Sequence, residues 1–132
     1  MKYSSKITVI IAIAALSFTS TSCNKDKEDP TIEISAPAKH SMHNWGNEVH
    51  LMATFGDDQG LKDYTVMIGD ADGNHSHAFD FMKTGTTTEI TYAFHEHFMV
   101  PDSAPEMAWA YFTVTDAEDK TSTMKWMLHF EE

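Results

Sequence analysis

Three features are scarce in this chain of 132 residues: it has one cysteine, no arginine and no long apolar run. Because Cys23 is the only cysteine, an internal disulfide is excluded. The uncharged, mostly apolar run over residues 7–16 is too short for a helix that spans a bilayer, which needs about 20 residues. We therefore expect neither a disulfide-linked fold nor a membrane-spanning helix.

The N-terminus is instead typical of a secretory signal. Lys2 and Lys6 precede the apolar run, and a stretch of small and polar residues leads to Cys23. This arrangement resembles the lipobox of bacterial lipoproteins, in which the cysteine is acylated and becomes the mature N-terminus. Ser20 departs from that motif, which usually has leucine there. The lipobox resemblance implies that Cys23 is lipidated.

A charged segment without apolar residues, 24–30, follows Cys23 and ends at a proline, so we expect a solvated tether. Its acidic residues resemble the surface-export signal of Bacteroidetes lipoproteins. The chain thus divides into a signal peptide (1–22), a lipidated cysteine with an acidic tether (23–30) and one folded domain (31–132). The expected location is the outer membrane, at the cell surface or on the periplasmic face, with the lipid anchor as the membrane contact.

The lack of arginine restricts the partners. Without residues 1–22, seven lysines stand against 20 acidic residues, a net charge of −13. Such a chain repels phosphate backbones, and it has no guanidinium groups for bidentate contacts with bases and phosphates. These features exclude nucleic acid as a partner and favour the accumulation of cations near the surface.

No long helical period occurs after residue 30. Short alternating runs, with turns at 56–60, 69–74 and 116–120, predict an all-β, immunoglobulin-like antiparallel β-sandwich of about seven strands. The expected inward-facing residues are Val49, Leu51, Ala53 and Phe55; Tyr64, Val66 and Ile68; Phe79 and Phe81; Ile90, Tyr92 and Phe94; Ala110, Phe112 and Val114; and Met124, Trp126, Leu128 and Phe130.

Four segments of this region occur in a characteristic order. They are PTIEI (30–34), FGDDQGL (55–61), DADGNHSH (70–77) and VTDAEDK (114–120). In this order they resemble an uncharacterised family of small Bacteroidetes lipoproteins that carries only a domain-of-unknown-function name. The Asp-Gly-x-His-x-His stretch is the most specific part, and the resemblance covers residues 30–132. It implies a cell-envelope lipoprotein with an immunoglobulin-like or PKD-like domain, and it brings no activity.

All eight histidines follow residue 39, and they include two alternate-residue pairs and one pair in a loop-like stretch. Alternate residues of a strand share a face, so two imidazoles can converge on one ion at about 2.0–2.1 Å. The predicted ligands of a transition-metal site are His75, His77, His95, His97, His40 and His43. Glu96 or Asp80 can add an oxygen. Glu96 falls at an inward position, which favours a β-bulge or an early strand end there.

Ligand type indicates the metal. Imidazole with a carboxylate suits zinc, and the only cysteine is committed elsewhere. Copper is the alternative, because Met42 lies beside His43 and Met99 lies two residues after His97, and thioethers favour Cu(I). Core or rim packing is the other explanation for these methionines. A weaker calcium hypothesis rests on Asp70 and Asp72, at positions that a tight turn equally requires.

Two functions follow. The first is a lipoprotein that captures or buffers zinc or copper at the cell envelope and passes it to an outer-membrane transporter or another envelope protein. Its affinity is expected to fall below about pH 6, since ligating imidazoles must be neutral. The second is a non-enzymatic adhesion or assembly module that presents exposed Trp45, Trp109 and Tyr111, with incidental histidines. No nucleophile elbow, P-loop or nicotinamide fingerprint occurs, so we do not expect an enzyme.

Overall fold

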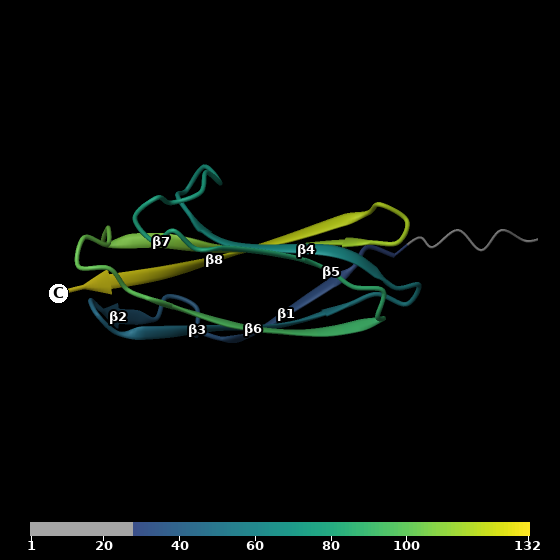
Figure 1. Cartoon of the computed structure of the whole chain (residues 1–132), viewed down its shortest axis with the longest axis horizontal. Helices are drawn as coiled ribbons and strands as arrows, with labels where there is room; N and C mark the ends of the chain where they lie inside the picture. Colours follow the sequence, from purple (N-terminus) through teal and green to yellow (C-terminus); the bar gives the residue numbers. More distant parts are fainter. Residues whose placement is uncertain (1–27) are drawn as a thin grey trace, which may run out of the picture.

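The computed structural model describes residues 28–132, which form two β-sheets packed face to face (Figure 1). The expected signal peptide and Cys23 lie outside the described residues. Nothing within 28–132 is a helix of the length and apolarity that crossing a membrane requires. The strands are β1 (Thr31–Ala36), β2 (Met42–Asn44), β3 (Glu48–Gly56), β4 (Leu61–Gly69), β5 (Met82–Thr86), β6 (Thr91–Met99), β7 (Met107–Asp116) and β8 (Thr121–Glu131).

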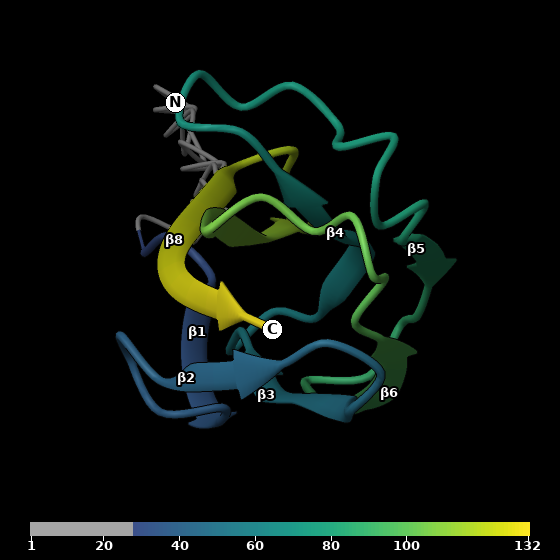
Figure 2. The ribbon, with the colours of Figure 1, turned by 90° about the vertical axis from the view of Figure 1, so that its left-hand side faces the viewer.

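The three-stranded sheet has the order β1-β3-β6, and the five-stranded sheet has the order β2-β8-β7-β4-β5. All neighbouring strands are antiparallel except β2 and β8, which are parallel. Figure 2 shows the two layers from the end at which the chain terminates. The predicted β-sandwich is therefore confirmed, with one strand more than expected, because β2 is too short to give an alternating pattern.

The core lies between the sheets and comes from alternate residues of the long strands. In β3 the burial alternates strictly, with Val49, Leu51, Ala53 and Phe55 at most 3% exposed. Burial of the larger ones, such as Leu51 and Phe55, stabilises the fold by about 1.5–3 kcal/mol each. The predicted alternation is thus confirmed in β3, and the same holds in β7, where Ala110, Phe112 and Val114 are buried.

Two details of the predicted core are different. Phe79 and Phe81 are buried, as expected, but they lie in the loop between β4 and β5 and not in a strand. Ile90 is 61% exposed, because the ladder of β6 begins only at Thr91 and the Ile90 carbonyl accepts a hydrogen bond from the Asp57 backbone N–H. Its side chain therefore lies beyond the edge of the core.

The register defines two ends of the sandwich. At the N-terminal end, Gly56 pairs with both Thr31 and Thr91, and Lys120 donates a hydrogen bond to the Glu28 carbonyl, close to where the described chain begins. At the C-terminal end, Glu48 pairs with Met99, and the chain terminates nearby (Figure 1). The eight residue-to-residue steps from Glu48 to Gly56 separate these ends by roughly 27 Å. All eight histidines lie between the middle of the strands and the C-terminal end.

Candidate metal centre

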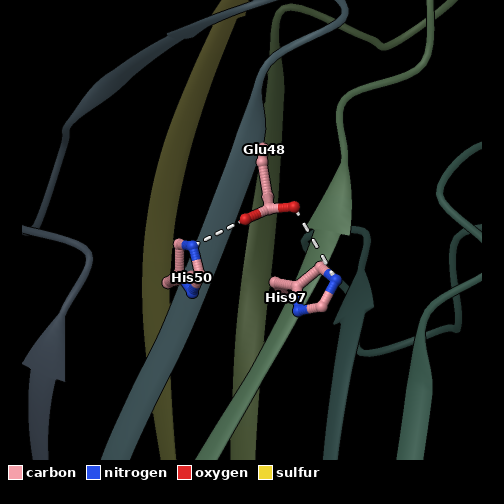
Figure 3. Close-up of side chains that lie close together, drawn as sticks. All are labelled: Glu48, His50 and His97. Atoms are coloured by element: carbon pink, nitrogen blue, oxygen red, sulfur yellow. Dashed lines mark ion pairs between the residues drawn. The ribbon is translucent and has the colours of Figure 1, made fainter.

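A carboxylate and two imidazoles meet on the outer face of the three-stranded sheet (Figure 3). Glu48 and His50 come from β3, where they alternate with buried Val49 and Leu51 and therefore point to solvent. His97 comes from β6 and is the direct cross-strand partner of His50. The strand period and the register thus place three potential ligands side by side without any loop.

The contacts within this group are specific. Glu48 Oε1 lies 2.7 Å from His50 Nε2, and Glu48 Oε2 lies 3.7 Å from His97 Nε2. His50 Nδ1 lies 2.9 Å from His95 Nε2, so His50 bridges the carboxylate and a further imidazole. The side chains of Glu48, His50 and His97 are 46%, 47% and 56% exposed. The group is therefore ordered by its own contacts but open to water.

This arrangement fits a tetrahedral ion with one open position. Ligand atoms about 2.1 Å from zinc stand roughly 3.4 Å apart in a tetrahedron. The potential ligand atoms of Glu48, His50 and His97 all lie within 4.8 Å of one another, so small side-chain rotations bring them to that spacing. When the Nε2 atom of His50 binds an ion, its Nδ1 atom can keep the hydrogen bond to His95, which orients the ring and fixes its tautomer.

Two methionines flank the group. Met99 is the cross-strand partner of Glu48, and Met52 is the partner of His95. Both are exposed, at 54% and 37%. The outer face of β3 and β6 therefore offers thioether sulfur beside imidazole and carboxylate, which keeps copper as an alternative to zinc at this site.

The predicted pocket of six histidines is not what the structure shows. Between residues 28 and 132, only one group holds at least three His, Cys, Asp or Glu ligands within 4.8 Å, and His97 is its only member from the predicted set. His75 and His77 do contact each other, with ring centroids 5.6 Å apart, but they lie in the loop between β4 and β5. The two alternate-residue pairs thus belong to different parts of the surface.

The predicted pair His40 and His43 does not stay together either. The ring of His40 lies 5.8 Å from that of His129, whereas His43 turns inward, 6.0 Å from the ring of Phe130. His43 Nε2 lies 2.7 Å from Ser41 Oγ, and burial lowers the pKa of His43. His40 lies in the turn before β2, whereas His43 lies at the inward position of β2, so the two imidazoles have different neighbours.

Glu48 and His50 were missed by sequence reasoning, although a signal for them was present. Glu48-x-His50 is an alternate-residue pair like His95-x-His97, and both fall on the outward alternation of a predicted strand. The outward direction of His95 and His97 is confirmed, since both are exposed. The β-bulge or early strand end expected at Glu96 is wrong, because the β3–β6 ladder runs without a break, β6 continues to Met99 and Glu96 is half-buried on the inner side.

The candidate calcium residue Asp70 serves its own turn. Its Oδ1 atom accepts hydrogen bonds from the backbone N–H groups of Asp72 and Asn74, and Oδ2 accepts one from the Asn74 side chain. The hydrogen bonds from Asn74, and further ones from the backbone, hold the pKa of Asp70 below its ordinary value. The turn explains the residues at 70–74 without an ion.

The three aromatic residues of the adhesion hypothesis are half-buried, which corrects the expectation that they are exposed. Trp45 packs against the core, and the Tyr111 hydroxyl donates a 2.6 Å hydrogen bond to the Asp70 carbonyl. Lys125 Nζ lies 4.9 Å from the ring centroid of Trp109 and 5.5 Å from that of Tyr111. Tyr111, together with Lys125, whose Nζ atom donates a hydrogen bond to the Ala71 carbonyl, holds the β4–β5 loop onto the five-stranded sheet.

The chain belongs to a family described as Domain of unknown function (DUF4625), whose model matches residues 18–129. No curated protein matches it. Among solved structures it is similar to the periplasmic chaperone SfaE, with a TM-score of 0.58 and 15% identity over 76% of this chain and 57% of that one. It is also similar to OgpA from Akkermansia muciniphila, with a TM-score of 0.52 and 11% identity over 78% of this chain and 29% of that one. These likenesses show the β-sandwich fold, and this chain spans less than two thirds of either structure.

Proposed function

We propose that this member of the DUF4625 family binds a divalent transition metal, zinc before copper, at Glu48, His50 and His97. The observation that carries the proposal is the approach of one carboxylate and two imidazoles on two directly paired strands. Three protein ligands and one open position are the ligand count of an exchangeable zinc site. The proposed role is capture or buffering, without catalysis.

The exposure of the ligands supports capture over a structural role. A structural zinc site is closed by four protein ligands, whereas here each of the three side chains is about half exposed. An ion can therefore enter and leave without unfolding any strand. The acidic character of the chain raises the local concentration of cations around it.

The location forms part of the proposal. The expected lipid anchor at Cys23 precedes residue 28, which lies at the N-terminal end of the sandwich. Glu48 and His97 lie toward the opposite end, roughly 27 Å along β3. In a lipid-anchored outer-membrane protein, this arrangement presents the metal to a transporter or another envelope protein and not to the bilayer surface.

The second candidate function, a non-enzymatic adhesion or assembly module, gains no specific support from the aromatic residues. Tyr111 is engaged by the β4–β5 loop, and Trp109 packs with Lys125. The adhesion hypothesis would therefore be favoured only if the metal-binding experiment shows no zinc binding.

Zinc titration of the purified protein by calorimetry tests the proposal. A Glu48→Gln/His97→Gln variant removes two ligands, and a Glu33→Gln/His77→Gln variant makes the same chemical changes at exposed positions outside the group. We expect the native protein and the control to bind one zinc ion with micromolar or tighter affinity, and the ligand variant to bind at least tenfold more weakly. Absence of binding by the native protein, with an unchanged melting temperature in excess zinc, would overturn the proposal and leave the adhesion module ahead.

A further inference from the structure

A second group of potential metal ligands lies at the C-terminal end of the five-stranded sheet, away from the Glu48 group. A cavity of about 480 Å³ opens there between the ends of β2, β7 and β8. Its lining includes two methionines, one histidine and three acidic residues: Met42, Met107, His129, Glu106, Glu131 and Glu132.

The register aligns the soft ligands of this cavity in one row. His129 of β8 pairs with Met42 of β2 on one side and with Met107 of β7 on the other. Residues that pair directly across a sheet point to the same face. The next residues along β7 and β8, Ala108 and Phe130, are buried, so the row points away from the core.

This row has the spacing that one ion needs. Neighbouring strands lie roughly 4.8 Å apart, so each thioether starts one strand away from the central imidazole. A methionine side chain has three rotatable bonds, which lets its sulfur turn toward an ion held on the His129 ring. Both methionines are about half exposed, at 55% for Met42 and 46% for Met107, and are therefore free to make that rotation.

We infer that the protein has a second metal site, which binds Cu(I) through the thioethers of Met42 and Met107 and the imidazole of His129. Thioether sulfur is a soft ligand that selects Cu(I), whereas it contributes little to zinc binding. The neighbouring His40 ring, whose centroid lies 5.8 Å from that of His129, can supply a further imidazole nitrogen. The copper enters already reduced, so that binding requires no electron transfer.

The surroundings of the row favour a cation. Glu106, Glu131 and Glu132 line the same cavity and give it negative charge. Trp45 also lines the cavity, where it packs against the core.

Competition for Cu(I) tests this site separately from the zinc site. The purified protein is titrated anaerobically with Cu(I) against the chromogenic chelator bicinchoninate. We compare Met42→Leu/Met107→Leu with Met82→Leu, which changes an exposed methionine at the opposite edge of the same sheet. We expect the native protein and Met82→Leu to bind one Cu(I), and the double variant to bind it at least 30-fold more weakly. Unchanged Cu(I) affinity in the double variant, or no Cu(I) binding by the native protein, would overturn the inference.

Two further measurements distinguish this inference from the proposed function. The Glu48→Gln/His97→Gln variant should lose zinc and keep Cu(I), while Met42→Leu/Met107→Leu should lose Cu(I) and keep zinc. Loss of Cu(I) from the Glu48→Gln/His97→Gln variant instead would place the copper at the first site and refute the second one. If the double methionine variant does not fold, His129→Gln with X-ray absorption of the bound copper gives the same answer, because its sulfur scattering must persist while one nitrogen ligand is lost.

Discussion

The two ends of the sandwich use similar polar residues in opposite ways. At the N-terminal end, polar side chains bond to one another and to the backbone. The Asp116 carboxylate is fully buried and accepts hydrogen bonds from the backbone N–H groups of Glu118 and Lys120, and Tyr64 and Tyr92 stack with their hydroxyl groups 3.1 Å apart. At the C-terminal end, the imidazoles, thioethers and carboxylate of the Glu48 group and of the Met42–His129–Met107 row are partly exposed.

This difference indicates that the polar groups that stabilise the fold and the polar groups that could bind a ligand lie at different ends of the same two sheets. Donors and acceptors that are satisfied internally stabilise turns and leave nothing for a ligand. Groups that are held by the register but not saturated by neighbours, such as His97 and Met107, remain available to an ion. The predictions below separate these two uses of polar residues.

The largest effect is expected from Asp116→Ala in the β7–β8 turn. The substitution leaves two backbone N–H groups without their acceptor and removes the 3.4 Å ion pair with Lys120. We expect the free energy of unfolding to fall by about 3 kcal/mol, with zinc affinity unchanged. Urea unfolding measures the loss, and Asp116→Asn, which keeps an acceptor oxygen, should lose clearly less. A loss below about 0.5 kcal/mol for the alanine variant would contradict this account of the turn.

The second effect is confined to the metal. His97→Gln should weaken zinc binding about tenfold, which corresponds to about 1.4 kcal/mol, while the melting temperature of the metal-free protein changes little because the side chain is exposed. Calorimetry gives the affinity and thermal unfolding in chelator gives the stability. His77→Gln serves as the matched control. Equal zinc affinity in the two variants would remove His97 from the ligand set.

A third prediction concerns alkaline pH and the N-terminal end. The hydrogen bond with Tyr92, together with burial, raises the pKa of Tyr64 to about 12. The folded protein therefore retains a proton that the unfolded chain loses near pH 10, so this stability is complete below pH 10 and disappears between about pH 10 and pH 12. Because the pair is only part-buried, we expect a loss of about 1 kcal/mol. Tyr64→Phe should flatten this part of the pH–stability curve, and an unchanged slope would refute the assignment.

The smallest effect is expected from His75→Ala/His77→Ala. These imidazoles contact each other but belong to no group of three ligands between residues 28 and 132. Zinc affinity at the Glu48 group should therefore change by less than twofold in calorimetric titrations. A larger loss would show that the β4–β5 loop takes part in the site, and it would make the two ends less distinct than the structure indicates.

Much of the fold could be predicted because strict alternation of hydrophobic and polar residues identifies a strand and its inward face. In β3, hydrophobic residues at every second position determine which side chains face the core, so Leu51 and His50 were assigned to the correct faces. Phe79 and Phe81 follow the same alternation but lie in a loop, since a loop that packs on the core also buries alternate residues. The short strand β2 has only three residues and relies on its pairing with β8.

The type of side chain in the Glu48 group could be predicted from the sequence, but its members could not. Alternation shows that His95 and His97 share a face, but it does not show which strand lies beside β6. That neighbour is β3, and the register of their pairing brings His50 opposite His97. His75 and His77 have an equally convincing spacing, yet they lie in a loop with no third ligand in the described region. Pairing between distant strands, which one sequence does not reveal, made the difference.

Because of the position of β6, the proposed metal binding would have a further consequence. β6 is the outermost strand of its sheet and is hydrogen-bonded only to β3 within the described part of the chain. Such a strand can fray, and its unused backbone groups can recruit another polypeptide. An ion bound by both His50 and His97 would link β3 to β6. This link would slow amide hydrogen exchange in the second half of β6. Without the metal, the exposed edge of β6 would pair more readily with a strand of another polypeptide.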